Sequence, residues 1–250
     1  MERGKYIIID GIEAIGKESL KRRITGLLQT KGIEVQNVRE PGGTQFAEIV
    51  RALIKEPVLT YEALRERFYL VPIRNGDSPI PGYDFSQPPN DDELLTRDSW
   101  TEVLAFLLSR SSAADRVILP AIKDGKWVVA DRAWTTTFAY QGFGRFDGEE
   151  EDLELIARNH KRILEKVFPG DRVYIIDITV EESFRRMKAD SVGRTTTDYM
   201  DRQQADFFER ARAGYQSLKR RYPKQVRIIN GMRRPEEIFT DIKADLERLL

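Results

Sequence analysis

A glycine-rich turn near the start of the chain has the spacing of a phosphate-binding loop. Gly11, Gly16 and Lys17 follow the pattern G-x-x-x-x-G-K, directly after the apolar run from Tyr6 to Asp10. Such a turn directs backbone N–H groups and a helix N-terminus at a phosphate, while the lysine reaches the β- and γ-phosphates. The alternative is an ordinary glycine-containing turn. Its place between a strand and an amphipathic helix favours phosphate binding.

The turn departs from the usual pattern at the residue after the lysine. Glu18 stands where a serine or threonine would supply a hydroxyl to Mg²⁺, and Ser19 comes one residue later. A carboxylate is a good Mg²⁺ ligand, so we hypothesise that Glu18 reaches the ion directly or through water. The residues predicted to bind ATP are Gly11, Ala14, Ile15, Gly16, Lys17, Glu18 and Ser19.

The elements that position this turn alternate between strands and helices. In the first expected helix, Leu20, Ile24 and Leu28 recur at helical spacing, and Gly32 follows as a C-cap would. Strands are expected over residues 6–10, 33–38, 127–130, 173–178 and 226–229, and further helices over 102–122, 150–167, 205–222 and 235–249. This alternation predicts an α/β fold with a parallel sheet and right-handed crossovers.

Composition excludes several classes of protein. The chain has 250 residues, 41 Lys plus Arg against 41 Asp plus Glu, no cysteine and one histidine, His160. Disulfides, thiolate sites and multi-histidine zinc sites are therefore excluded, and no net charge draws the chain to nucleic acid or anionic lipid. The apolar stretch at the N-terminus is too short for a signal peptide or a membrane span. We expect a cytoplasmic protein without nucleic-acid or membrane partners.

One segment interrupts the alternation of strands and helices. Residues 57–98 hold six of the 11 prolines of the chain, together with the polar run PPNDDE. Prolines at this density disfavour a regular strand or a long helix. A loop-rich insertion of this length serves as a lid, a partner surface or a surface excursion without function, and the sequence leaves these three open.

Four further motifs extend the evidence from the turn. They are REPGGT from Arg39 to Thr44, TEVLAFLLSR ending at Arg110, VVADR ending at Arg132, and TTTFAYQGFGR over 135–145. In order and spacing, these motifs and the glycine-rich turn resemble thymidylate kinases. The resemblance implies a P-loop NTPase fold, a three-layer sandwich with about five parallel strands flanked by helices. It also implies transfer of the ATP γ-phosphate to dTMP with Mg²⁺, in a homodimer.

The resemblance also implies roles for the residues around the phosphates. Arg39 and Arg132 would hold the acceptor phosphate, because planar guanidinium groups suit phosphate oxygens. Asp131 would organise the reacting phosphates and the metal, which our separate hypothesis for Glu18 also concerns. The residues expected to act in catalysis are Lys17, Asp131, Arg132 and Arg194.

A second group of residues is expected to bind the sugar and the base. By resemblance, Glu13 approaches the deoxyribose 3′-hydroxyl, and Tyr140 and Gln141 lie beside the sugar and base. Phe106 and Arg110 are four residues apart, so one helix face would present a ring for stacking and a guanidinium for a pyrimidine carbonyl. Thr136 matches a serine of the family that reaches the base edge directly or through water.

Departures from the family fall mostly on the ATP side. Ala14 and Ile15 replace small loop residues, and Tyr199 takes a lid position often held by arginine. Arg194 is our candidate for the lid arginine. The sequence predicts one kinase domain over 1–250, with the insertion at 57–98 and a lid at 186–200. Two alternatives stay open: a kinase for another pyrimidine nucleotide, and a nucleotide-binding protein with little kinase activity.

Overall fold

The computed structural model describes residues 2–55, 98–190 and 204–250. The predicted insertion at 57–98 falls outside this part of the chain except for Asp98, the N-cap of a helix. The predicted lid falls outside it from residue 191 onward, and with it Arg194 and Tyr199.

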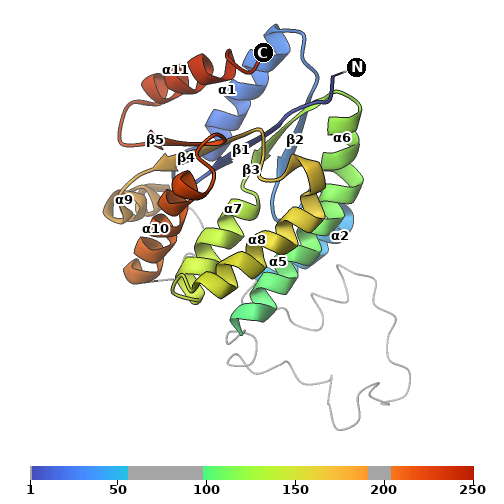
Figure 1. Cartoon of the computed structure of the whole chain (residues 1–250). Helices are drawn as coiled ribbons and strands as arrows, with labels where there is room; N and C mark the ends of the chain where they lie inside the picture. The colour runs from blue at the N-terminus through green and yellow to red at the C-terminus, as the bar shows by residue number, and fades with distance from the viewer. Residues whose placement is uncertain (1, 56–97, 191–203) are drawn as a thin grey trace, which may run out of the picture.

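Five parallel strands form one sheet in the order β2-β3-β1-β4-β5. The central strand β1 is an aliphatic run buried along its whole length, as expected for a parallel strand covered on both faces. Figure 1 shows the sheet between layers of helices. The strands are β1 Tyr6–Asp10, β2 Val35–Arg39, β3 Trp127–Asp131, β4 Arg172–Asp177 and β5 Val226–Asn230. The predicted α/β sandwich is confirmed.

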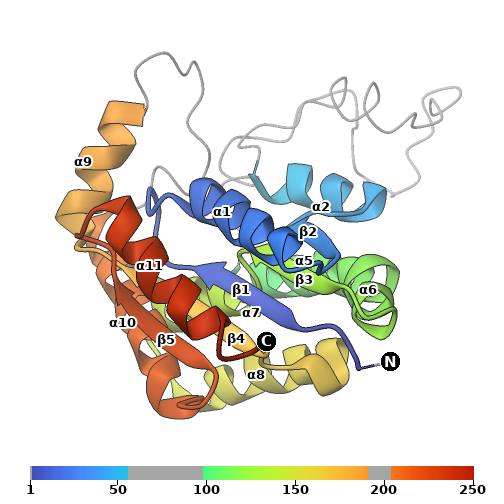
Figure 2. The same ribbon diagram turned by 90° about the horizontal axis from the view of Figure 1, so that it is seen from above.

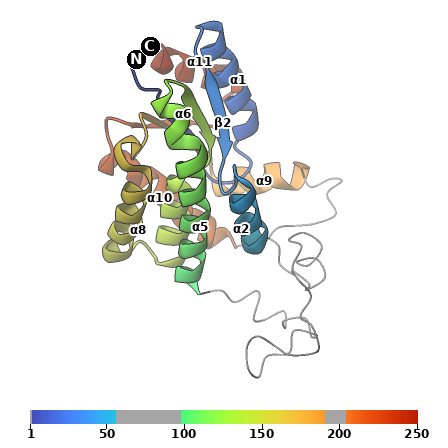
Figure 3. The same cartoon turned by 90° about the vertical axis from the view of Figure 1, so that its right-hand side faces the viewer.

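Helices cover both faces of this sheet. Helices α1 and α11 lie on one face, and α5, α7, α8 and α10 lie on the other (Figure 2). Figure 3 shows α2 packed beside α5. The helices are α1 Lys17–Thr30, α2 Gln45–Lys55, α5 Ser99–Ala113, η2 Ala114–Ile118, α6 Leu119–Lys123, α7 Trp134–Thr137, η3 Phe138–Arg145, α8 Glu150–Leu164, η4 Glu165–Val167, α9 Val180–Asp190, α10 Ala205–Arg221 and α11 Pro235–Leu246.

The expected helix over 102–122 is divided into three parts. A five-residue π-helical stretch, η2, separates α5 from α6. Pro120 lies in the first turn of α6 and has no N–H, so the regular ladder of i to i−4 hydrogen bonds cannot pass through it. The other predicted helices are confirmed to within a few residues. No helix in the described ranges is long and apolar enough to cross a membrane.

Candidate active site

The glycine-rich turn joins the carboxyl end of β1 to the start of α1. A Cβ on Gly11 would lie 2.5 Å from the carbonyl oxygen of Ile176, so the turn passes too close to β4 for any side chain. Gly16 has φ 79° and forms the N-cap of α1, a left-handed conformation that glycine adopts without strain. Both glycines of the motif are therefore required by the backbone. They leave the N-terminus of a 14-residue helix open for a phosphate.

Lys17 points back over this turn. Its Nζ donates to the carbonyl oxygen of Ile12 at 3.2 Å and lies 3.9 Å from Oε2 of Glu13. Burial lowers the pKa of Lys17, and the nearby positive charge of Arg132 lowers it further, while Glu13 acts in the opposite sense. A lysine held this way has a weakly compensated charge, which an anionic ligand would stabilise.

The remaining loop residues divide into buried and exposed ones. Ile15 is buried in the hydrophobic core, and Ala14 has φ 57°. Glu18 and Ser19 lie on the exposed side of the first turn of α1, where the Glu18 carboxylate pairs with Nζ of Lys21 at 2.6 Å. The backbone of the turn thus keeps the geometry for phosphate, while the side chain of Glu18 is engaged on the surface.

Arg132 forms the centre of a second cluster, directly after β3. It has φ 64°, a conformation unusual for a non-glycine residue and common where a functional side chain must be aimed. Its Nη2 donates to Oε1 of Glu13 at 2.5 Å, and the hydroxyl of Tyr140 donates to the same oxygen at 3.3 Å. The guanidinium also lies 5.4 Å from the centre of the Tyr140 ring. Glu13, Lys17, Arg132 and Tyr140, all predicted from the sequence, therefore lie together.

Asp10 supports this cluster from beneath and was missed by sequence reasoning. Its buried carboxylate accepts hydrogen bonds from the backbone N–H of Gly11 at 2.9 Å and from the hydroxyls of Thr135 at 2.5 Å, Thr136 at 2.7 Å and Tyr215 at 2.8 Å. Nη1 of Arg132 lies 3.6 Å from the same carboxylate. The signal in the sequence was a lone acid at the end of an aliphatic strand. Thr136, predicted to reach a base edge, donates to Asp10.

Arg110 lies in a buried polar cluster between α5, α7 and α8. Its Nε pairs with Glu40, and its Nη1 contacts Oγ1 of Thr137 at 3.2 Å and Nε2 of His160 at 2.5 Å. Both Arg110 and Glu40 are almost fully buried. Phe106, one turn earlier on α5, is half-buried and does not belong to the hydrophobic core. Sequence reasoning had not singled out Glu40, and it had noted His160 only as the sole histidine.

Gln141 is oriented by a buried carboxylate. Its Nε2 donates to Oε2 of Glu102 at 3.1 Å, and Arg145 pairs with the same carboxylate at 3.3 Å. Among the residues that the structure describes, the amide oxygen of Gln141 has no hydrogen-bond partner, and Gln141 is 1% exposed. A buried carbonyl without a donor carries a desolvation cost, which a ligand N–H would relieve.

Arg39 and Asp131 end neighbouring strands. They are paired in the register of β2 and β3, so both lie at the carboxyl edge of the sheet, where open α/β sheets bind their ligands. Nη2 of Arg39 donates to the two carboxylate oxygens of Glu48 at 3.0 and 3.1 Å, and its side chain is 47% exposed. Arg39 therefore lies at this edge of the sheet with a half-exposed side chain whose guanidinium is engaged by Glu48.

No group of three or more acidic or histidine side chains that could hold a metal occurs in the described part of the chain. Mg²⁺ does not require such a group, because it keeps several waters and is bound through one or two carboxylates together with substrate phosphates. Asp131 and Glu18 are the two carboxylates predicted for that purpose.

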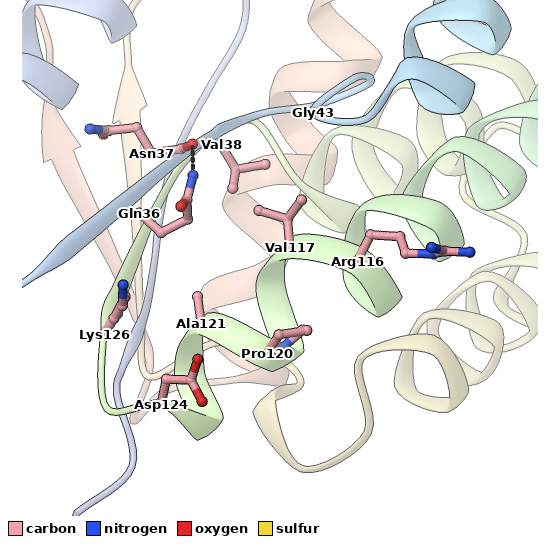
Figure 4. A pocket seen from close by; sticks show the side chains of 10 residues that line it. All are labelled: Gln36, Asn37, Val38, Gly43, Arg116, Val117, Pro120, Ala121, Asp124 and Lys126. Atoms are coloured by element: carbon pink, nitrogen blue, oxygen red, sulfur yellow. Dashed lines mark hydrogen bonds between the residues drawn. The ribbon is translucent and has the colours of Figure 1, made fainter.

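A hollow of about 320 Å³ lies elsewhere, at the edge of the sheet (Figure 4). Gln36, Asn37 and Val38 of β2 line one side, and Val117 and Ala121 of the helices η2 and α6 line the other. It reaches Lys126, which precedes β3, whereas the glycine-rich turn follows the carboxyl end of β1. The hollow is thus separate from the cluster around Arg132.

Comparison with known proteins agrees with this geometry. Residues 92–242 match the family model for thymidylate kinase. The thymidylate kinase of Carboxydothermus hydrogenoformans is 30% identical over 99% of this chain and 98% of its own, and that of Glaesserella parasuis is 32% identical over 99% and 98%. The crystal structure of thymidylate kinase from Ehrlichia chaffeensis has the same fold, with a TM-score of 0.63 and 21% identity over 98% of this chain and 99% of that one. The chain belongs to the thymidylate kinase family.

Proposed function

We propose that this protein is a thymidylate kinase, which transfers the γ-phosphate of ATP to dTMP and yields dTDP. The observation that carries the proposal is the meeting of two clusters at the carboxyl edge of the sheet. The glycine-rich turn with Lys17 is suited to a nucleoside triphosphate. Arg132, Glu13 and Tyr140 stand beside it, with Lys17 only 3.9 Å from Glu13. A donor and an acceptor phosphate can therefore be held next to each other.

The reaction asks the protein to align two phosphates and to neutralise charge, not to form a covalent intermediate. Lys17 would bind the transferred phosphate of ATP, and Arg132 and Arg39 would bind the acceptor phosphate of dTMP. Asp131 and Glu18 would hold Mg²⁺, which would supply positive charge to offset that of the phosphates. Arg194 would add a further cation from the lid segment.

The acceptor nucleoside would lie over Tyr140 and α5. Phe106 would stack on the pyrimidine, Arg110 would donate to a carbonyl of the base, and the buried amide oxygen of Gln141 would accept from an N–H. Glu13 would bind the 3′-hydroxyl. Thr136 would act on the base through a water molecule, since its hydroxyl is bonded to Asp10.

We further propose a homodimer formed through α5 and α2. Leu104 and Leu108 are four residues apart on α5 and are 61% and 50% exposed, and Phe46 on the neighbouring α2 is 49% exposed. Large apolar side chains gathered on adjacent helices are typical of an interface. The chain would form a single kinase domain over 1–250 with its insertion at 57–98 and its lid at 186–200. A cytoplasmic location stays a prediction.

Two measurements test the proposed activity. Turnover is compared with dTMP, dUMP and dCMP as acceptors and Mg-ATP as donor, and dTMP and ATP are titrated separately by calorimetry. We expect turnover with dTMP to exceed that with dCMP, because Arg110 and the oriented amide of Gln141 match a carbonyl and an N–H, which thymine carries side by side.

The engagement of Glu18 with Lys21 favours one rival, a binding protein with little kinase activity. Tight binding of dTMP without binding of Mg-ATP would support that rival. Faster turnover of another pyrimidine nucleotide than of dTMP would identify that nucleotide as the substrate instead. The Lys17→Met variant serves as a matched control, since it should lose turnover and keep dTMP binding.

A further inference from the structure

His160 is the one histidine of the chain and is fully buried on α8. Its Nδ1 lies 2.7 Å from the carbonyl oxygen of Ile156, and its Nε2 lies 2.5 Å from Nη1 of Arg110. A backbone carbonyl only accepts hydrogen bonds, and a guanidinium only donates them. The ring must therefore carry its hydrogen on Nδ1 and accept from Arg110 at Nε2, which sets both the tautomer and the neutral state.

Arg110 is fixed on one side and left open on the other. Its Nε pairs with Glu40, and Nη1 donates to Thr137 and to His160, so three of the five N–H groups of the guanidinium are used. Within the described residues, Nη2 makes no hydrogen bond. His160 and Thr137 together fix the guanidinium in one orientation. In that orientation Nη2 remains for a ligand.

The charges in this cluster balance only while the imidazole is neutral. Arg110 from α5 is countered by Glu40, whose second oxygen accepts from the Tyr6 hydroxyl of β1 at 3.1 Å. The residue of α7 that faces the imidazole of His160 is Trp134, which is uncharged, and the two ring centres are 6.3 Å apart. Burial and the charge of Arg110 lower the pKa of His160 well below its ordinary value, in keeping with a ring that accepts.

We propose that His160 is a positioning residue for recognition of the pyrimidine base, which holds the guanidinium of Arg110 with Nη2 directed to a carbonyl oxygen of the base. The inference rests on the proposed function, since it takes Arg110 as a group that touches the base. An acceptor at this point is needed because Arg110 would otherwise bury an unpaired N–H, and its planar guanidinium would be held less firmly against rotation about the Cδ–Nε bond. Without this acceptor, Arg110 would no longer favour a base that presents a carbonyl oxygen.

The test compares His160→Leu, which removes the acceptor at similar volume, with His160→Gln, whose amide oxygen can occupy the place of Nε2. Steady-state kinetics give kcat and the KM values for dTMP and ATP separately. We expect His160→Leu to raise the KM for dTMP about tenfold, as for one lost hydrogen bond to a charged group, with the KM for ATP unchanged. His160→Gln should return the KM for dTMP to within about threefold of wild type.

A second measurement needs no variant, should His160→Leu fail to fold. The single histidine gives one set of imidazole signals in a ¹⁵N spectrum of the wild-type protein, recorded with and without saturating dTMP. Protonation on Nδ1, together with a shift of the Nε2 signal when dTMP binds, supports the proposal. Protonation on Nε2, or no response to dTMP, overturns it.

Different results would contradict the proposed function and the role of His160. Absence of both dTMP turnover and dTMP binding in the wild-type protein overturns the proposed function. Normal wild-type turnover with an unchanged KM for dTMP in His160→Leu overturns only the role of His160. Equal increases in the KM values for dTMP and ATP in both variants would also overturn it, because they would indicate a general packing effect.

Discussion

Nη2 of Arg132 lies 2.5 Å from Oε1 of Glu13, although the two residues are 119 positions apart in the chain. The contact joins the strained residue after β3 to the glycine-rich turn after β1. Neighbouring parallel strands bring the two together, because β1 and β3 are adjacent in the sheet and both end at the same edge. The pair thus ties the glycine-rich turn, which is predicted to bind ATP, to the residue that is predicted to bind the acceptor phosphate.

The first prediction concerns the carboxylate of this pair. Glu13→Gln should weaken dTMP binding by about 1.5 to 3 kcal/mol, the value of a hydrogen bond to a charged group. Because the carboxylate is expected to meet the 3′-hydroxyl, the variant should also lose the preference for dTMP over its 3′-deoxy analogue. Calorimetry with both nucleotides measures this, with the surface change Glu154→Gln as control. An undiminished preference for dTMP in Glu13→Gln would place the 3′-hydroxyl elsewhere.

The second prediction concerns the proposed stacking platform. Phe106→Ala should weaken dTMP binding by about 1 to 3 kcal/mol and leave ATP binding unchanged. Phe106 is half-buried and lies outside the hydrophobic core, so the free energy of unfolding should change little. Titrations of both nucleotides and a thermal melt separate these effects, with Ser111→Ala on the exposed side of the same helix as control. Equal dTMP affinity in wild type and variant would make Phe106 a structural residue.

The third prediction concerns Glu18 and Mg²⁺. The ion pair of Glu18 with Lys21 is on the surface, and such pairs contribute about 0 to 1 kcal/mol, so a bound Mg²⁺ can displace it. We expect ATP binding to depend steeply on Mg²⁺ in the wild type and less steeply in Glu18→Thr, with turnover kept. ATP affinity is measured for both proteins across a Mg²⁺ series. If wild type binds ATP equally well with and without Mg²⁺, the carboxylate stays with Lys21 and takes no part in the metal site.

The fourth prediction concerns association through α5. Leu108→Lys places a charge on the exposed apolar face, and it should shift a dimer toward monomer because a buried unpaired ammonium is costly. Sedimentation velocity over a range of protein concentrations measures the shift. Met232→Lys is the matched control, since Met232 is also 50% exposed but lies outside α5 and α2. A wild-type protein that is monomeric at all concentrations would contradict the interface.

The fifth prediction concerns pH. Because the pKa of His160 is lowered by burial, the unfolded chain takes up a proton near pH 6.5 and the folded protein does so only at lower pH. The free energy of unfolding should therefore be fully maintained above about pH 6.5 and decrease below it, by at most about 1.4 kcal/mol per pH unit from this group. Denaturant unfolding from pH 7.5 to 5 measures the slope. The slope should be shallower in His160→Gln, and identical slopes would show that His160 titrates normally.

The fold was predictable because its strands are short aliphatic runs, each followed by helical spacing. Helices α2 and α9 and the helical stretch from Trp134 to Arg145 were not predicted. In the last of these, the run of threonines and the two glycines have low helix propensity, and the helix is stabilised by packing against α10. Tertiary contacts of this kind leave no local pattern in the sequence.

The site was predictable wherever a motif marked it, as at Gly11, Lys17 and Arg132. The partners of those residues were not. Asp10 and Glu40 act through buried hydrogen bonds to residues far along the chain, and neither spacing nor composition signals such contacts. The partners in the surface ion pairs, Lys21 for Glu18 and Glu48 for Arg39, were not predicted either, because the sequence does not show which neighbour an exposed charge selects.

The place of β1 at the centre of the sheet has a consequence during synthesis of the protein. This strand is made first, yet its hydrogen-bonding partners are β3 and β4, in the register Tyr6 with Val128 and Ile7 with Arg172. The ribosome must therefore make the whole stretch from β1 to β3 before the first strand gains any neighbour in the sheet. Until then an aliphatic segment is exposed to other nascent chains, so chaperone binding matters most at this stage of synthesis.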